Sequence, residues 1–308
     1  MFEAFRYIFR RTVKLSMACA LVTLAPSASS QAASFVYATN ISNDSISQYR
    51  VVRGGLAALS PAAVGTGNQQ PLGLAVAPDR RNVYVASFDP AGAILQYGVG
   101  ASGALTFRST VAAPSGAGPF SLAVSPNGRS VYVTNRFGGS EPVLQYTVQR
   151  DGSLLPKSPV AVASSPGPEH VAVSPDSRSV YVTNDGGTVS QFTAAPDGSL
   201  TPKSPPTVPT GSGDEFAEPV GLAIAPDGKS VYVANSEAFL SLSGSISQFA
   251  VEPGGGLIPK VPASVPASGH PFDLVVTPNG RHVYATNPSP LGTGPGTILQ
   301  YSAARDEA

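Results

Sequence analysis

One eleven-residue word, written five times, constrains the fold of this chain more than any other feature. It reads PNGRSVYVTNR from Pro126, and related words begin at Pro78, Pro175, Pro226 and Pro278. Each word starts with a Pro-Asp or Pro-Asn corner that suits a tight turn, and continues as a short apolar run that suits a strand. The tyrosines of these runs, together with Tyr37, are spaced 47, 48, 49, 51 and 52 residues apart. The chain therefore repeats one structural unit six times.

Each repeat contains three further runs around this word. A run after a proline precedes it (PFSLAVS at Pro119), and a run with glutamine and an aromatic residue follows it (PVLQYTV at Pro142). A fourth run comes after a glycine turn (GSLLPKSPVAV at Gly152). Four short strands in a repeat of about 40–50 residues are typical of a β-propeller blade. Strands that lie between two other layers are apolar on both faces, which fits runs such as LAVS and VYVT. We predict an all-β protein, a propeller of about six four-stranded blades.

The two ends of the repeat array are short of strands. The first unit begins directly at SFVYATN, without a run before its word, and the last unit ends at TILQYSAARDEA, without a fourth run. The sequence therefore predicts an incomplete six- or seven-bladed ring. It also predicts an open inner strand edge at residues 35–39, where the first unit lacks its inner strand.

The N-terminal segment differs in composition from the repeats. Four basic residues within the first 14 precede an apolar run over residues 15–25, and small residues follow. This order predicts a signal peptide at residues 1–32 and a single propeller domain at residues 33–308, secreted or held in the periplasm or at the cell surface. The apolar run is about half the length of a membrane span, so we expect none. The single cysteine, Cys19, lies in this segment.

Charge and residue usage exclude several classes of function. Of the 19 basic and 19 acidic residues, the segment 1–32 holds four and one, which leaves 15 against 18 and no basic cluster. Nucleic-acid binding is therefore not expected. Three scattered histidines and the absence of cysteine from the predicted domain argue against a zinc site. Asp214 and Glu215 lack the alternating ligand spacing of a calcium loop. No dinucleotide or phosphate-loop motif occurs, so we expect no cofactor and no metal.

The words VYVTN, SPNGRSVYVTN and GSLTPKSP resemble the YVTN-repeat, lactonase-like β-propellers of bacteria, over nearly all of residues 34–303. The resemblance implies a propeller fold, usually of seven blades. Members of this wider group include 6-phosphogluconolactonases and carboxymuconate-cyclising enzymes. Propeller lactonases of this type place a histidine, a glutamate and an arginine at the mouth of a channel. The repeated words themselves are scaffold, so a specific function has to lie where the repeats differ.

Residues that differ between repeats are expected on one rim of the ring. If the run after the proline is innermost, the loop before it and the loop after VYVTN open on the same side. This rim would carry a catalytic group of His170, Glu169 and Arg136 and ligand-binding residues Asp185, Glu218, Asp273 and His270. Arg136 could hold a carboxylate or phosphate of a lactone, while His170 or Glu169 activates water as a general base.

Two functions are consistent with these residues. The first is a secreted propeller that binds a small molecule, a carbohydrate or a protein on this rim without catalysis, and it is favoured by the small number of reactive groups. The second is a lactone hydrolase or a carboxymuconate-cyclase-like enzyme that uses His170, Glu169 and Arg136. It is favoured by the family resemblance.

Overall fold

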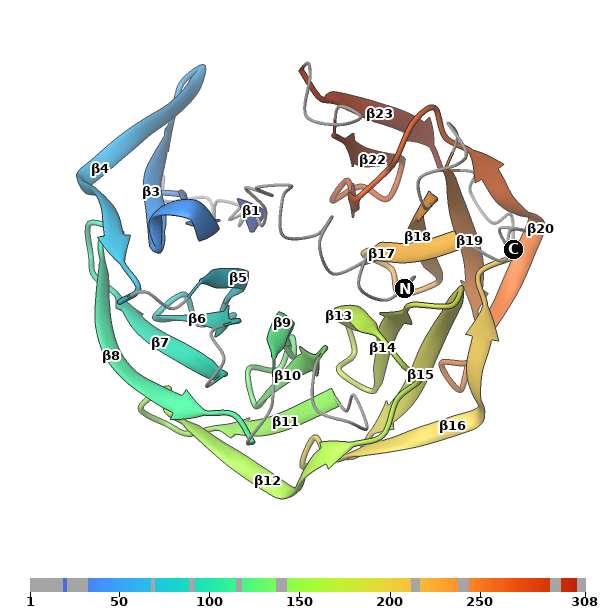
Figure 1. Ribbon diagram of the computed structural model, residues 1–308, viewed down its shortest axis with the longest axis horizontal. Coiled ribbons are helices and arrows are strands. Elements are labelled where there is room, and N and C mark those ends of the chain that lie inside the picture. The colour runs from blue at the N-terminus through green and yellow to red at the C-terminus, as the bar shows by residue number, and fades with distance from the viewer. Residues whose placement is uncertain are drawn as a thin grey trace, which may run out of the picture. The chain divides into compact units, whose positions relative to one another are not determined.

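A computed structural model describes residues 19–20, 33–67, 70–88, 92–114, 118–136, 143–211, 217–237, 244–288 and 295–303. Its strands form six antiparallel sheets, in each of which neighbouring strands follow the order of the chain (Figure 1). The protein is an all-β, six-bladed propeller, as the repeat predicts. Among the described residues, no helix has the length and apolar character needed to span a membrane.

The strand bounds follow the repeat closely. The first sheet contains β1 (Cys19–Ala20), β2 (Phe35–Asn40), β3 (Ser45–Val52) and β4 (Gly55–Gly65), with the 3₁₀ turn η1 (Ile41–Asn43) between β2 and β3. The second contains β5 (Pro71–Val76), β6 (Asn82–Ser87), β7 (Ala93–Val99) and β8 (Leu105–Ala112). The third contains β9 (Pro119–Val124), β10 (Ser130–Asn135), β11 (Val143–Val148) and β12 (Leu154–Val162).

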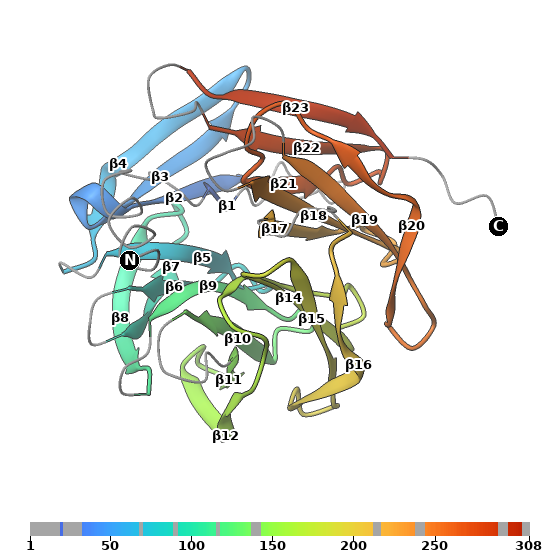
Figure 2. The ribbon, with the colours of Figure 1, turned by 45° about the vertical axis from the view of Figure 1, so that its right-hand side comes forward.

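The remaining sheets have the same order. The fourth contains β13 (Pro168–Val173), β14 (Ser179–Asn184), β15 (Thr188–Ala194) and β16 (Leu200–Pro209). The fifth contains β17 (Ala217–Ile224), β18 (Ser230–Glu237), β19 (Ser245–Val251) and β20 (Leu257–Pro266). The sixth contains, within the described residues, β21 (Asp273–Val276), β22 (His282–Asn287) and β23 (Thr297–Ser302), which lie side by side in Figure 2. The absence of a fourth strand from this sheet, within the described residues, agrees with the sequence-based prediction.

The inner edge of the first sheet is covered at two of the positions predicted to be open, and at these two the sequence-based prediction is wrong. β1 pairs with β2 in an antiparallel register that sets Cys19 opposite Ala38 and Ala20 opposite Tyr37. Unpaired backbone groups on a strand edge readily bind another extended segment, and two residues of the N-terminal segment fill that position here. The pairing covers two positions of β2, Tyr37 and Ala38.

Two compact units divide the chain, and each has its own apolar core. Residues 1–122 and 150–153 make up one unit, whose core includes Ile46, Val83 and Leu95. Residues 123–149 and 154–308 make up the other, and its inner strands β13, β17 and β21 contact one another in succession.

The VYVT strands β6, β10 and β14 are buried at all six positions. This explains why their sequences do not alternate between apolar and polar residues.

In the first four blades, the tyrosine of the second strand fastens one blade to the next. The hydroxyl groups of Tyr37, Tyr84, Tyr132 and Tyr181 donate to the carbonyl oxygens of Gly103, Gly152, Gly198 and Gly255, at 2.6 to 2.7 Å. Each acceptor lies in the glycine turn that precedes the fourth strand of the following sheet. We call this contact the tyrosine clasp. The four tyrosines are 0–2 % exposed, and burial raises the pKa of three of them, Tyr37, Tyr84 and Tyr181, to about 12.

A glutamine of the third strand strengthens the same contact. Gln145 donates from Nε2 to the carbonyl of Pro159 in its own sheet (2.8 Å) and accepts at Oε1 from the amide of Leu200 in the next sheet (2.9 Å). Gln48 and Gln191 make the equivalent pairs of hydrogen bonds. The glycine of the turn is required, because a Cβ atom on Gly198, at φ +81°, would lie 1.9 Å from Oγ of Ser130. The repeated word is thus first of all a device for stacking blades.

Candidate functional site

The loops that carry the candidate residues lie at one edge of each sheet. Pro168 at the start of β13 pairs with Asn184 at the end of β14, and Pro219 pairs with Asn235 in the fifth sheet. The residue after Asn184 and the residues around Pro168 therefore belong to the same rim. The Pro-Asp and Pro-Asn corners lie at the opposite end of these strands. The division of loops expected from the sequence is present within each sheet.

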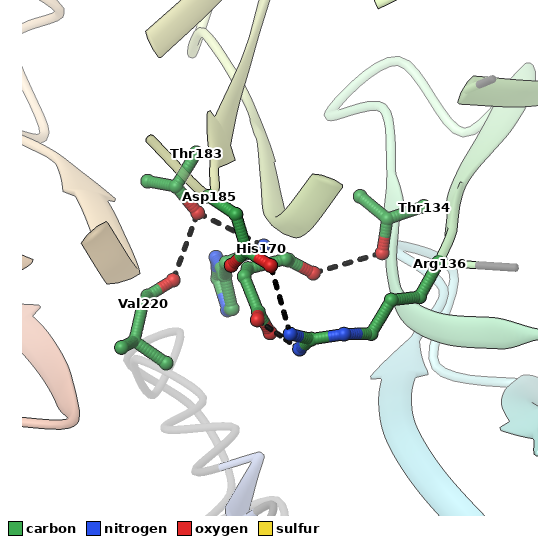
Figure 3. Close-up of polar contacts among 7 residues, drawn as sticks. Thr134, Arg136, His170, Thr183, Asp185 and Val220 are labelled. Carbon is green, nitrogen blue, oxygen red and sulfur yellow. Dashed lines mark hydrogen bonds and ion pairs between the residues drawn. The ribbon is translucent and has the colours of Figure 1, made fainter. Parts of the chain in front are cut away.

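Arg136 joins two carboxylates of the neighbouring blade. It follows β10 directly, and its guanidinium forms ion pairs with Oε1 of Glu169 on β13 and, at 3.2 Å, with Oδ2 of Asp185 after β14. Figure 3 shows the side chain of Arg136 reaching from the end of β10 toward Asp185. Glu169 is 3 % exposed and Arg136 is 9 % exposed. Because one cation faces two carboxylates, this group, which we call the arginine cluster, carries a net charge of −1 when all three residues are ionised.

Threonines of the repeated word hold the backbone on which the cluster is built. Oγ1 of Thr134 donates to the carbonyl of Glu169 (2.8 Å), and Oγ1 of Thr183 donates to the carbonyl of Val220 (2.9 Å) (Figure 3). Thr183 also accepts at Oγ1 from the amide of His170 (3.0 Å). The two bonds donated by the threonines connect the second strand of one blade to the first strand of the next, and the bond from the His170 amide lies within the fourth sheet. They fix the backbone of Glu169 and His170 without using either side chain.

A glycine gives Asp185 the space it occupies. Gly167 has φ +67°, and its carbonyl accepts from the amide of Asp185 at 2.8 Å. A Cβ atom at this position would lie 2.4 Å from Cβ of Asp185. Any larger residue at position 167 would therefore displace the carboxylate that Arg136 binds.

His170 lies next to Glu169 in the chain and presents an unsatisfied nitrogen. Its ring is partly exposed, yet Nδ1 is buried and has no hydrogen-bond partner in the described part of the chain. Buried polar atoms in folded proteins nearly always have a partner, which is often water or a ligand. A neutral imidazole has one nitrogen that accepts a hydrogen bond, and the exposed part of the His170 ring can meet a small molecule at the rim.

The remaining candidates are distributed over other sheets. Glu218 lies on β17, opposite Ser236. Asp273 begins β21, and its Oδ1 accepts from the amide of the next residue, Leu274, at 2.8 Å. His270 precedes β21, and its amide donates to Oδ1 of Asn287 at 2.8 Å. The other two acidic candidates, Asp214 and Glu215, lie outside the described residues.

The inner strands of the fifth and sixth sheets approach each other closely at one of these positions. A Cβ atom on Gly221 would lie 2.6 Å from Cα of Asp273. His170 and Asp273 share the same place in the repeat, two residues after the proline, but only His170 lies beside the arginine cluster. The sites of Glu218, Asp273 and His270 thus belong to the rim by position, and their binding role stays a prediction.

Thr134, Thr183 and Gly167 also belong to the site, although no sequence pattern singled them out. The two threonines belong to the repeated word, and Thr39 in the first blade likewise donates to the carbonyl of Leu72 at 2.7 Å. A repeated scaffold residue carries no signal that marks it as functional. The glycine before the proline could have been noticed, because glycine tolerates positive φ.

Metal binding has no preformed ligand set in the described chain. Across the described ranges, no group of three or more histidine, cysteine, aspartate or glutamate side chains is placed to share an ion. The carboxylates of Glu169 and Asp185 form ion pairs with the guanidinium of Arg136. The chemistry that this arrangement can supply is acid–base chemistry at His170, beside a polar network whose geometry is held by ion pairs.

Solved structures of low sequence identity share the fold. A candidate 6-phosphogluconolactonase from Bacteroides fragilis is 22 % identical, covers 90 % of this chain and 83 % of its own, and has a TM-score of 0.70. The periplasmic gluconolactonase of Pseudomonas aeruginosa is also 22 % identical, with 88 % and 82 % covered and a TM-score of 0.62. Hydrazine synthase of Kuenenia stuttgartiensis matches at 18 % identity, with 87 % and 80 % covered and a TM-score of 0.64. Proteins with different chemistry therefore use this scaffold.

The comparison that defines the family is a sequence match. The family described as lactonase, 7-bladed β-propeller, matches residues 36–141 and 138–289. The described residues form six sheets where that description counts seven blades. No curated protein matched the chain. Since the family match covers most of the repeat array and the six sheets have the expected strand order, this chain belongs to the lactonase family of β-propellers.

Proposed function

We propose that this protein hydrolyses small uncharged lactones on the rim that carries His170 and the arginine cluster. The observation that supports this most is the buried Nδ1 of His170, which lacks a hydrogen-bond partner in the described chain and lies next to the ion-paired Glu169. Family membership supports lactone chemistry, and two structural neighbours bear the names gluconolactonase and 6-phosphogluconolactonase.

His170 is the general base of the proposed reaction. The partly exposed imidazole takes a proton from a water molecule while the water oxygen bonds to the lactone carbonyl carbon. The tetrahedral intermediate then breaks the ring C–O bond, and the protonated imidazole returns the proton to the leaving oxygen. The product is the open hydroxy acid, so one lactone and one water are consumed for each product formed. The reaction requires no redox partner.

Arg136 acts as a positioning residue in this proposal. Glu169 and Asp185 already compensate its charge, and the cluster carries a net charge of −1. An incoming carboxylate or phosphate would therefore meet net negative charge, which opposes its binding. The negative charge of the cluster favours an unphosphorylated lactone over a phosphorylated one, so we no longer assign Arg136 the anion-binding role considered from the sequence.

The test compares two lactones and two histidines. Purified protein is assayed for acid release from glucono-δ-lactone and from its 6-phosphate. We expect turnover of the neutral lactone to exceed that of the phosphate. His170→Gln should lower kcat/KM by roughly 100-fold or more, the usual contribution of a general base. His282→Gln is the matched control, because His282 also has a buried Nδ1 without a partner in the described chain but lies at the other rim. Equal rates for wild type and His170→Gln would refute the proposal.

A second candidate is ligand binding without catalysis. It is favoured by the burial of Glu169, which is 3 % exposed and bound to Arg136, because such a carboxylate is poorly placed to activate water. Calorimetric titration with lactones and with the corresponding open sugar acids separates the two functions. Saturable binding with no acid release would support the binding protein.

We also propose that the protein is exported. The basic, apolar and small-residue order of residues 1–32 supports this, and the Pseudomonas neighbour is described as periplasmic. N-terminal sequencing of the exported protein should begin at or near Ala33. Cleavage would also remove β1 from the inner edge of β2. Recovery of soluble protein that starts at Met1 would contradict export.

A further inference from the structure

A cavity of about 480 Å³ opens between the third and fourth sheets, at the opposite end of the strands from His170. Arg129 in the corner before β10 and Val148 at the end of β11 form one wall, and the amide of Val148 donates to the carbonyl of Arg129 at 2.9 Å. Pro196 and Asp197, in the glycine turn before β16, form the other wall. All the lining residues belong to the second compact unit. A cavity of this size has room for a small molecule.

Lys157 of β12 crosses from the third sheet to the glycine turn of the fourth. Its ammonium group donates to Oγ1 of Thr147 at 2.9 Å and to the carbonyl of Asp197 at 2.5 Å. A lysine has three N–H donors, so one donor of Lys157 has no partner in the described chain. Burial lowers the pKa of Lys157, while the charge of Asp197 acts in the opposite direction. The ammonium group is thus partly removed from water, a condition that a bound anion would compensate.

The guanidinium of Arg129 is the second cation at the cavity. Arg129 is exposed, and its side chain makes no hydrogen bond or ion pair with the described residues. Asp197 contributes a carboxylate, whose Oδ1 accepts from the amide and the hydroxyl of Ser199 at 2.9 and 2.7 Å. These hydrogen bonds hold the pKa of Asp197 below its usual value of 3.8, so it is ionised at neutral pH. Two cations and one carboxylate give a net charge of +1, whereas the arginine cluster carries −1.

The rest of the lining suits a ligand that carries hydroxyl groups. Oδ2 of Asp197 has no partner in the described chain and can accept from a hydroxyl. The hydroxyl groups of Thr147, Ser158 and Ser199 also border the cavity and can exchange hydrogen bonds with a polyol. The ring of Pro196 adds an apolar surface for the carbon atoms of such a ligand. The cavity therefore combines positive charge with the polar and apolar contacts that a carbohydrate needs.

The interface between the fourth and fifth sheets has only part of this set. Both cations recur there, as Arg178 and Lys203, and the ammonium group of Lys203 makes the equivalent bonds to Thr193 and Gly254 at 3.0 and 2.8 Å. Glycines at positions 254 and 256 replace the aspartate and the serine of the cavity. The lysine bridge is thus a feature of blade stacking, and the groups that suit a polyol distinguish the cavity between the third and fourth sheets.

We propose that this cavity binds a small sugar phosphate. The phosphate group would lie between the guanidinium of Arg129 and the unused N–H of Lys157, and the sugar hydroxyl groups would bond to Asp197 and the neighbouring hydroxyl groups. A phosphate monoester such as phosphoserine carries about −1.5 to −2 charges at pH 7, so it matches two cations more closely than a carboxylate does. Arginine also binds two phosphate oxygens at once. This site lies at the other rim from the proposed lactone site and does not depend on it.

Calorimetric titration of the purified protein with ribose 5-phosphate tests this site. We expect saturable binding that weakens as salt is added, since exposed charges are screened. Inorganic phosphate should bind more weakly because it lacks the sugar hydroxyl groups, and ribose alone should give no saturable heat. Arg129→Gln should weaken the binding of ribose 5-phosphate by roughly 10-fold or more, as expected for a hydrogen bond between charged groups. Lys157→Met should weaken it as well.

Two controls separate this site from the rest of the molecule. Arg178→Gln is the matched variant, because Arg178 occupies the same corner position in the next sheet, and it should leave the affinity unchanged. Arg129→Gln should keep the melting temperature and the lactone turnover of the wild type, since its side chain has no contact to lose and lies far from His170 in the repeat. Absence of binding, or equal losses in Arg129→Gln and Arg178→Gln, would overturn the proposal. Equal affinities for inorganic phosphate and ribose 5-phosphate would also overturn it, because the cavity would then hold an adventitious ion only.

Discussion

Removal of the arginine from the arginine cluster should destabilise the protein far more than removal of a surface arginine. Arg136→Ala leaves Glu169, which is 3 % exposed, without the cation that compensates its charge. Loss of one partner from a buried ion pair typically costs about 3–5 kcal/mol. The side chain of Asp185 is 26 % exposed, so solvent screens its share of the loss. We therefore expect about 3 kcal/mol, toward the lower end of that range.

This loss is large enough to measure in two independent ways. At about 2–4 °C per kcal/mol for a domain of this size, the melting temperature should fall by roughly 6–12 °C. In urea the midpoint should fall while the dependence on denaturant stays constant, which identifies a change in stability and not in the extent of unfolding. Adding Glu169→Gln to Arg136→Ala should recover part of the loss, because a buried neutral amide costs less than a buried uncompensated charge.

Arg178→Ala is the control for this experiment. Arg178 is exposed on the corner before β14, so its removal should cost less than about 0.5 kcal/mol. Stability of Arg136→Ala within the same margin of wild type would refute the reasoning. It would mean that the guanidinium and Glu169 are solvated in solution and that the rim has no buried ion pair.

The remaining predictions concern the tyrosine clasp, the loss of folding stability at alkaline pH, and Gly167 beside Asp185. Tyr132→Phe should cost about 1–3 kcal/mol in urea unfolding because it leaves a buried carbonyl without its donor, while Tyr232→Phe, which breaks no bond, should stay within about 0.5 kcal/mol. Burial raises the pKa of Tyr181 from 10.0 to about 12, so its contribution to stability is complete below pH 10 and is lost as the pH rises toward 12. Ultraviolet titration of tyrosinate with parallel unfolding should show both changes, and a tyrosine titration completed near pH 10 in folded protein would contradict the burial. Gly167→Ala should destabilise by more than about 1 kcal/mol and lower lactone turnover, because φ is +67° there and the added methyl group would displace Asp185. Unchanged stability and activity would contradict this prediction, because they would show that the residues around position 167 make room for the methyl group.

The sequence alone determined the blade and its strands. Turn corners such as Pro126–Gly128 and the strand runs around Tyr132 act locally, through backbone preferences and short apolar patterns. Their repetition at nearly constant spacing was enough to predict a propeller with six units, and a last unit without a fourth strand. It also placed His170, Glu169 and Asp185 on one rim, since strand direction follows from strand order.

Only the tertiary structure decided which of these residues meet. Arg136 and Glu169 are 33 positions apart and form an ion pair because neighbouring blades stack, a relation that no local pattern encodes. The same stacking turned an arginine that could bind an anion into a buried partner of two carboxylates. It also gave the repeated tyrosine its role, because the hydroxyl of Tyr132 finds its acceptor 66 residues away in the next glycine turn. Local sequence specifies each blade, and long-range packing between blades specifies the site.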